Sequence, residues 1–163
     1  MAEHEVPVLI AGGGPVGLAA SICLSELGVP SLLVEQHAAT TTHPKATVVN
    51  ARTFELFRRW GIEDEVRRGG LPLDKSRYIV WATTLTGYEL GRLDLAAGAG
   101  GDAAQRGRLS PTMTGICPQD VYEPILRRRA ESAAGAAVRF ATRLLAFEAD
   151  ADAVTAVIAA AEG

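Results

Sequence analysis

The chain of 163 residues has the length of about one domain, and with 48% hydrophobic and 21% charged residues it has the composition of a folded protein. Its net charge of -3 and the lack of a basic stripe argue against nucleic-acid binding. An acidic N-terminus that runs directly into an apolar segment argues against a secretory signal peptide, and no apolar run approaches the ~20 residues of a membrane span. We therefore expect a cytoplasmic protein that binds neither nucleic acid nor a membrane.

The segment 6–35 predicts a strand, a tight turn, a helix and a second strand. Residues 6–11 are apolar, an Ala- and Leu-rich segment runs from the turn to Gly28, and a second apolar segment, 31–34, ends on Glu35. The apolar residues at helical spacing, which predict the buried face of this helix, are Val16, Ala20, Cys23 and Leu27, widened by Leu18 and Ile22.

The turn carries the pattern G-x-G-x-x-G at Gly12, Gly14 and Gly17. Gly12 lets the chain turn off the strand, Gly14 lets the backbone approach a pyrophosphate, and Gly17 lets the helix pack closely on the strand. Glu35 stands where an acid can accept hydrogen bonds from the ribose of an adenine nucleotide. Such glycine patterns also arise by chance in loops, but the strand, helix, second strand and acid favour a dinucleotide site.

The two cysteines, Cys23 and Cys117, predict neither a disulfide framework nor a metal site. They lie far apart, and no C-x-x-C pair or histidine cluster accompanies either. Cys23 falls on the predicted apolar face of the first helix, so we expect a buried thiol there.

A loop, 36–44, separates the second strand from a second helix that begins near Asn50, a good N-cap, and ends at Gly61. A short helical segment, 63–68, follows. The side chains expected to point inward from the second helix are Phe54, Phe57 and Trp60. The arginines expected to be solvated are Arg58, Arg59, Arg67 and Arg68.

From Ser76 the spacing of apolar residues changes from that of a helix to that of a strand. The segments 78–81 and 88–90 predict two strands that form a hairpin. The Ala- and Gly-rich run 96–107 has no periodicity and predicts a loop. A third helix is expected over 118–134, with Asp120 and Glu123 in a capping box.

Three further strands are predicted over 137–140, 144–148 and 154–160. The last is nearly all apolar, as expected of a parallel strand covered on both faces, yet little sequence follows it. We therefore expect an incomplete α/β fold, the N-terminal part of a longer protein.

The sequence resembles the FAD-dependent aromatic hydroxylases, the class A flavoprotein monooxygenases of the p-hydroxybenzoate hydroxylase type. It is most similar to the branch that acts on phenols, hydroxyphenylpropionates and aromatic polyketides. The segments that carry the resemblance are V-L-I-A-G-G-G-P-V-G-L at 8–18, V-E at 34–35, H-P-K-A-T-V-V-N-A-R-T-F-E at 43–55, W-G-I at 60–62 and P-Q-D at 118–120. The block 43–61 is the most specific, because general dinucleotide folds do not carry it.

The resemblance implies that 1–163 is the N-terminal portion of a Rossmann-like FAD-binding βαβ domain with an additional β-hairpin or β-meander. About 76–116 would belong to the start of the substrate-binding sheet. The residues that it implies bind FAD are Gly12, Gly14, Pro15, Val16, Gly17, Glu35, Gln36, Lys45, Arg52 and Gln119. Two further flavin motifs of the family, an Asp-Gly pair and a Gly-Asp pair, are expected further along than residue 163. The chain is therefore expected to hold the adenosine end of FAD, and no catalytic residue is assigned.

Two positions depart from the family pattern. Gln36 stands where the family commonly has Arg after the ribose acid, so a contact near the adenine is weakened or replaced by His37. Lys45 keeps the charge of the usual Arg but gives up its bidentate geometry. Three alternative interpretations remain open. Arg52 is a structural residue of a helix start, Lys45 is a solvated cation, or His37 is an ordinary surface histidine.

For the whole protein the resemblance implies reduction of FAD by NAD(P)H and transfer of an oxygen atom from O2 to a small aromatic substrate, phenolic or polyketide. Halogenation, Baeyer-Villiger oxygenation or a reduction on the same scaffold are alternatives. A truncated, non-catalytic nucleotide-binding module is another. This chain alone is expected to be inactive without the missing C-terminal part.

Overall fold

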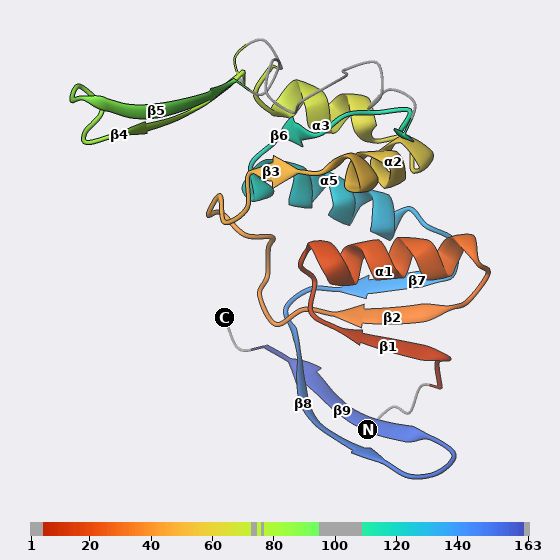
Figure 1. The fold of residues 1–163 in the computed structure, drawn as a ribbon. Helices are drawn as coiled ribbons and strands as arrows, with labels where there is room; N and C mark the ends of the chain where they lie inside the picture. Colours follow the sequence, from red (N-terminus) through yellow and green to blue (C-terminus); the bar gives the residue numbers. More distant parts are fainter. Residues whose placement is uncertain (1–4, 73–74, 76, 95–108, 162–163) are drawn as a thin grey trace. The chain divides into compact units, whose positions relative to one another are not determined.

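The computed structural model describes residues 5–72, 75, 77–94 and 109–161 (Figure 1). The chain divides into two compact units, one made of Met1–His43 and Glu123–Gly163 and the other of Pro44–Tyr122. The loop predicted over 96–107 lies outside the described residues.

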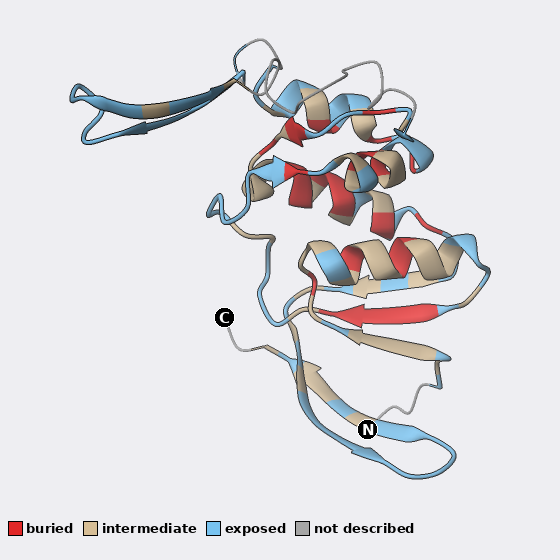
Figure 2. Cartoon of the chain, viewed as in Figure 1, coloured by how far each residue is buried: buried red, intermediate tan, exposed pale blue. Residues whose placement is uncertain are grey.

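The first unit contains a parallel three-stranded sheet. Its strands are β1 (Val8–Ala11), β2 (Ser31–Val34) and β7 (Ala136–Arg139), in the order β1-β2-β7. Helix α1 (Pro15–Glu26) connects β1 to β2 and lies against the sheet (Figure 1). All of β2 is buried, as Figure 2 shows, because this central strand pairs with β1 and β7 at its two edges and α1 packs on it. The predicted βαβ unit and the first of the three tail strands are confirmed.

The buried face of α1 differs from the predicted one. Leu18 and Ile22 are fully buried, whereas Val16 is 84% and Leu27 is 74% exposed. The reason is the close packing of Gly17 on the strand, which turns the side of the helix that carries Leu18 and Ile22 inward.

The predicted burial of the Cys23 thiol is not confirmed. Cys23 is only half-buried, whereas Cys117, in the second unit, is 1% exposed. Burial raises the pKa of the Cys117 thiol to about 11, with a contribution from the charge of Asp120. Cys117 is therefore neutral at physiological pH, as expected of an inert packed thiol.

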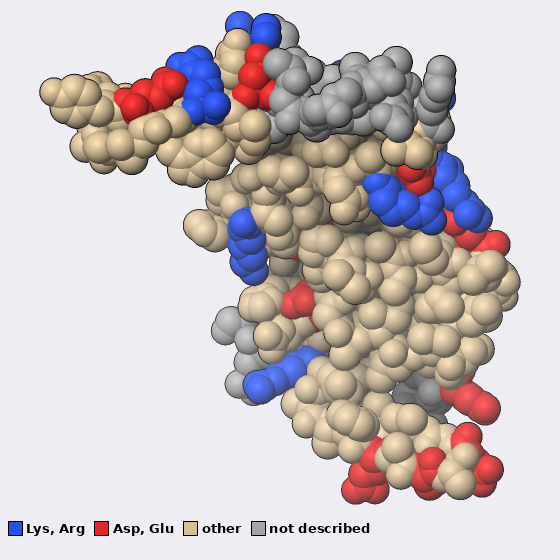
Figure 3. All heavy atoms as spheres, viewed as in Figure 1, with Lys and Arg blue, Asp and Glu red and all other residues tan. Residues whose placement is uncertain are grey.

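The other two tail strands form an antiparallel hairpin, β8 (Thr142–Ala149) and β9 (Val154–Ala160). The strands are confirmed, but β9 pairs with β8 and is not a strand of the parallel sheet. Phe147 and Val157 are 66% and 46% exposed, so the apolar composition of this region does not mean burial in the described chain. Figure 3 shows acidic side chains gathered toward the turn of the hairpin, where the sequence carries Glu148, Asp150 and Asp152.

The second unit contains two predicted helices, α2 (Ala51–Arg59) and α3 (Glu63–Gly69), both confirmed. Asn50 caps α2 as expected, because its side chain accepts a hydrogen bond from the Thr53 N–H at 2.8 Å. Two very short strands, β3 (Val48–Val49) and β6 (Gly115–Ile116), pair antiparallel and were not predicted. Two residues are too few to show the alternation by which a strand is recognised.

The core of the second unit is aromatic. Phe54 and Phe57 are 1% exposed and Trp60 is 5% exposed, which confirms their predicted orientation. The Phe54 and Phe57 rings meet edge to face with centroids 5.6 Å apart, and Phe57 lies 6.1 Å from the Tyr122 ring. Such edge-to-face pairs stabilise a core beyond the burial of their area.

Arg67 is not solvated as predicted. Its guanidinium donates to Glu63 at 2.9 Å and to the Thr112 hydroxyl at 2.7 Å, and it lies over the Phe54 ring at 3.9 Å from the centroid. A sequence pattern could not show this, because Thr112 is distant along the chain.

The predicted hairpin is confirmed as β4 (Tyr78–Ala82) and β5 (Glu89–Asp94), which pair antiparallel. Its aromatic side chains are exposed: Tyr78 by 44%, Trp81 by 53% and Tyr88 by 85%. The two strands form a sheet of their own among the described residues.

Helix α5 (Gln119–Glu131) confirms the third predicted helix, but not its capping box. Because the helix begins at Gln119, Asp120 lies in its first turn rather than at the N-cap. Glu123, only 3% exposed, accepts a hydrogen bond from the Thr41 N–H at 3.0 Å and so holds the loop after β2.

Within the part of the chain that the structure describes, no helix combines the length and the apolar character needed to cross a membrane. The same residues contain no group of three His, Cys, Asp or Glu side chains placed to hold a metal ion.

Candidate nucleotide-binding site

The C-terminal edge of the parallel sheet brings together the glycine turn and the predicted ribose acid. Gly12 directly follows β1 and Glu35 directly follows β2. The Gly12 N–H donates to Val34 O at 2.8 Å, and the Glu35 N–H donates to Arg139 O at 2.9 Å. These bonds extend the strand pairing beyond the strands, so both residues are fixed at the edge where open α/β sheets bind ligands.

The three glycines differ in what their missing side chains permit. Gly12 has a φ of 114°, which a residue with a side chain rarely adopts. A Cβ on Gly17 would lie 1.9 Å from the Gly12 carbonyl oxygen, so α1 can pack here only with glycine. A Cβ on Gly14 would meet no atom of the described residues within 4 Å, so the space beside the Gly14 Cα is open to a ligand.

The start of α1 is available to an anion. Gly14 is the N-cap, no side chain caps the helix, and the first helical residue is Pro15, which has no N–H. Val16 in the same turn is 84% exposed. Backbone N–H groups and the positive end of the helix dipole therefore lie at a helix start that no side chain of the described residues caps, and this fits a pyrophosphate.

The carboxylate of Glu35 is held by three donors. Its Oε2 accepts the Gly13 N–H at 2.7 Å, and its Oε1 accepts the His37 N–H at 2.8 Å. The His37 ring Nδ1 lies 2.6 Å from the same Oε1. Burial by itself raises the pKa of Glu35, but the hydrogen bonds from His37 and Gly13 together outweigh it, so the pKa lies below its ordinary value of 4.5.

This lowered pKa predicts a contribution to stability that depends on pH. A carboxylate whose pKa is lower in the folded state stabilises the fold above its ordinary pKa of 4.5 and loses that contribution as the pH falls through the folded value. The difference in unfolding free energy between the wild type and Glu35→Gln should therefore shrink between pH 7 and about pH 3. Urea unfolding at several pH values measures it, and a difference that grows on acidification would contradict the assignment.

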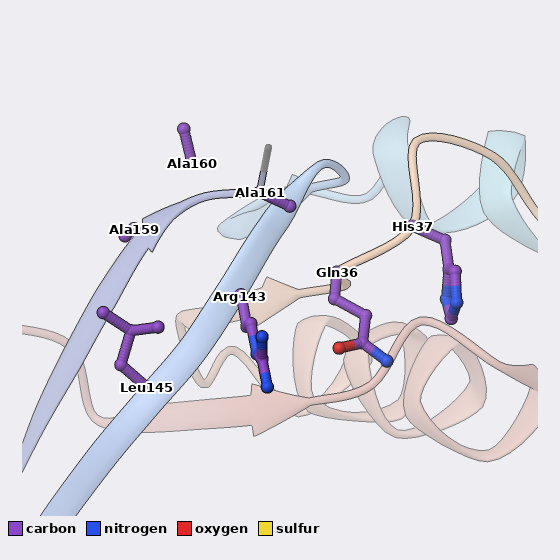
Figure 4. A pocket seen from close by; sticks show the side chains of 7 residues that line it. All are labelled: Gln36, His37, Arg143, Leu145, Ala159, Ala160 and Ala161. Carbon is purple, nitrogen blue, oxygen red and sulfur yellow. The ribbon is translucent and has the colours of Figure 1, made fainter. Parts of the chain in front are cut away.

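A hollow of about 550 Å³ is lined in part by the two residues that follow Glu35 in the chain (Figure 4). The residues that line it are Gln36, His37, Arg143, Leu145, Ala159, Ala160 and Ala161. Its wall therefore combines hydrogen-bonding side chains from the end of β2 and from β8 with small apolar side chains from the end of β9 (Figure 4). A flat, partly apolar group with hydrogen-bonding edges, such as a purine, matches this lining.

The other predicted site residues, Lys45, Arg52 and Gln119, belong to the second unit. Gln119 is the first residue of α5, and Lys45 is exposed in the segment before β3. A backbone hydrogen bond from Cys117 N–H to Thr47 O, 2.8 Å long, ties these two segments together. Arg52 is 76% exposed at the start of α2 and forms an ion pair with Glu55 at 2.6 Å, a contact that a structural residue of a helix start would make. Its predicted role toward the cofactor stays a prediction.

The contacts of Gly13, Phe140 and Arg127 beside the glycine turn were not predicted from the sequence. Gly13 is buried, and a Cβ there would lie 2.7 Å from the Glu35 Cβ and 3.0 Å from the Phe140 Cζ. Phe140 in turn carries the Arg127 guanidinium over its ring, at 3.6 Å from the centroid. The run of three glycines at 12–14 was the available sign that Gly13 also lacks room for a side chain.

Comparisons with known proteins agree with this geometry. A family model described as an FAD-binding domain matches residues 5–163. A putative polyketide hydroxylase of Streptomyces coelicolor is 42% identical over 159 residues, which is 98% of this chain and 25% of that protein. The tetracenomycin B2 monooxygenase-dioxygenase of Streptomyces olivaceus is 40% identical over 97% of this chain and 31% of that protein.

A solved structure gives the same result. The crystal structure of the flavin-dependent monooxygenase PieE, in complex with FAD and substrate, superposes with a TM-score of 0.83 and 35% sequence identity. The match covers 97% of this chain and 27% of PieE. The chain thus spans about a quarter to a third of the length of the proteins it matches.

Proposed function

Because the chain belongs to the FAD-binding domain family, whose model spans residues 5–163, we propose that the edge formed by β1, β2 and α1 binds the adenosine diphosphate end of FAD. One observation carries the proposal: the open space beside the Gly14 Cα lies at an uncapped helix start in the same unit as Glu35. A pyrophosphate needs the open space at the uncapped helix start, and a ribose needs the carboxylate of Glu35.

Individual residues then have distinct tasks. The pyrophosphate would be held by N–H groups of the turn, which is formed by Gly12, Gly14, Pro15, Val16 and Gly17. Glu35 would accept the ribose hydroxyls, and Gln36 would border the adenine in the hollow. Lys45, Arg52 and Gln119 would add a cation, a second cation and a directed amide donor toward the cofactor.

For the whole protein we propose a flavin-dependent monooxygenase that hydroxylates a phenolic or polyketide aromatic substrate with NAD(P)H and O2. Support comes from relatives named as polyketide hydroxylases and as 2,4-dichlorophenol 6-monooxygenase. When bound, the flavin supplies the redox chemistry, while this chain binds and orients its adenosine end. The exposed aromatic side chains of the β4–β5 hairpin support its assignment to the start of a substrate-binding sheet, which covers about residues 76–116.

The test is turnover by the full-length gene product on a panel of phenols and aromatic polyketides. The proposal predicts NAD(P)H oxidation that depends on the substrate and a product that contains one oxygen atom from isotopically labelled O2. A product mass that shows halogenation or simple reduction, or a product NMR spectrum that shows insertion of the oxygen atom into a carbon-carbon bond, would contradict hydroxylation. No substrate-dependent oxidation with any aromatic compound would contradict the monooxygenase.

A further inference from the structure

The Glu35 carboxylate is occupied unevenly by its protein donors. Its Oε1 meets two donors of one residue, the His37 N–H at 2.8 Å and the His37 Nδ1 at 2.6 Å. Its Oε2 meets one donor, the Gly13 N–H at 2.7 Å. Since each carboxylate oxygen offers about two acceptor sites, Oε1 is saturated and Oε2 keeps one site for an incoming hydroxyl.

The main chain around His37 is held by hydrogen bonds from residues 141 and 142. The Ala141 N–H donates to His37 O at 2.9 Å, and the Thr142 N–H donates to Glu35 O at 2.8 Å. The next carbonyl, that of Ala38, accepts a longer hydrogen bond of 3.4 Å from Arg127. The segment that joins β7 to β8 therefore holds residues 35–37 in place, and the His37 ring is presented to Glu35 from a fixed main chain.

We propose that His37 is a positioning residue for ribose recognition: it saturates Oε1 of Glu35 and so leaves Oε2 as the atom that accepts the ribose hydroxyl. The inference rests on the proposed binding of FAD at this edge. It gives a task to the histidine that stands two residues after the ribose acid, where the preceding residue is Gln36 rather than the arginine common in the family.

Exposure limits the size of the effect. The His37 side chain is 74% exposed, whereas that of Glu35 is only 14% exposed. Water around the exposed His37 ring weakens its hydrogen bond to Glu35. We therefore expect this bond to contribute to FAD affinity about as little as other partly exposed polar contacts do. The exposure also means that a substitution at residue 37 leaves the buried core unchanged.

The experiment compares His37→Leu, which removes the ring donor, with His37→Asn, whose side-chain amide can donate from a similar position. The FAD dissociation constant of the 163-residue chain is measured by flavin fluorescence titration at pH 7. We expect His37→Leu to weaken binding about threefold to tenfold and His37→Asn to stay within about twofold of the wild type. The urea unfolding midpoint of His37→Asn should match that of the wild type, and that of His37→Leu should fall only slightly, because the ring donates one hydrogen bond from an exposed position.

A double-mutant cycle with Glu35→Gln tests the route of the effect. If His37 acts through Glu35, His37→Leu should change FAD affinity much less in the Glu35→Gln background. An equal loss in both backgrounds, equal loss with Leu and Asn, or no loss with Leu would each overturn the inference and leave FAD binding standing. A wild-type chain that binds no FAD would overturn the proposed function of the chain, and the inference with it.

Discussion

Gly14→Ala should lose most of its affinity for FAD while keeping the stability of the wild type, and Gly17→Ala should lose the fold itself. A Cβ at Gly14 meets no protein atom within 4 Å, and the residue has an extended backbone that alanine adopts easily. A Cβ at Gly17 would stand 1.9 Å from the Gly12 carbonyl oxygen and 3.3 Å from Ile10 Cγ2. The two glycines of one motif therefore separate binding from folding.

The expected sizes differ in the same way. Overpacking at Gly17 should lower the free energy of unfolding by about 3 kcal/mol or more, because a backbone carbonyl must move. At Gly14 the new methyl group would occupy space that the pyrophosphate needs, and an affinity loss of at least about tenfold is expected. Urea unfolding and flavin fluorescence titration measure the two quantities on the same samples.

The pair also contains its own control. If Gly14→Ala binds FAD as the wild type does, the pyrophosphate does not lie against this turn. If Gly17→Ala is as stable as the wild type, the close approach of α1 to Gly12 is not a constraint on the fold. Each result would overturn the role proposed for the substituted glycine and leave the role of the second glycine untouched.

Glu35→Gln should weaken FAD binding by about tenfold to hundredfold, since a hydrogen bond to a charged acceptor is worth about 1.5–3 kcal/mol. The amide oxygen can accept from Gly13 or from His37, but the amide NH2 then faces the other N–H. The substitution thus removes the acceptor for the ribose and also disturbs the orientation of the side chain.

A matched substitution at an acid outside the site checks this prediction. Glu148→Gln, on β8, removes the same charge from an exposed residue near the hairpin turn and should leave FAD affinity unchanged. Equal losses in the two variants would mean that net charge, rather than contact at Glu35, controls binding.

The segments that could be predicted from sequence are those whose pattern is local. The strands at 8–11 and 31–34, the helix start at Asn50 and the inward aromatic residues of α2 follow from short-range periodicity and capping, and all were correct. The glycine pattern also predicted the turn at Gly12, where φ is 114°, and the close approach at Gly17.

The errors arise where distant segments decide the outcome. On α1 the predicted burial was right for Leu18 and Ile22 but wrong for Val16 and Leu27, because the close approach of Gly17 to Gly12 and Ile10 orients the helix. The capping box at Asp120 was wrong because Glu123 instead holds the loop at Thr41. Neither contact has a signature within a sequence window.

The site shows the same division. Glu35 and the glycines could be placed from one stretch of sequence, whereas the hydrogen bonds that hold residues 35–38 are made with the segment 139–142 and with Arg127 of α5, which are distant along the chain. His37 had been open between an ordinary surface residue and a substitute for the missing arginine. Its contact with Oε1 of Glu35 favours a third interpretation, in which it acts on the acid.

The most direct test of the account is a visible absorption spectrum of the purified 163-residue chain after it has been mixed with FAD and desalted, with Gly14→Ala beside it. The account predicts an equimolar flavin band in the wild type and little or none in the variant, although both remain folded by circular dichroism. A folded wild-type chain that emerges colourless, or a variant that retains as much flavin as the wild type, would contradict the claim that this edge of the sheet holds the cofactor.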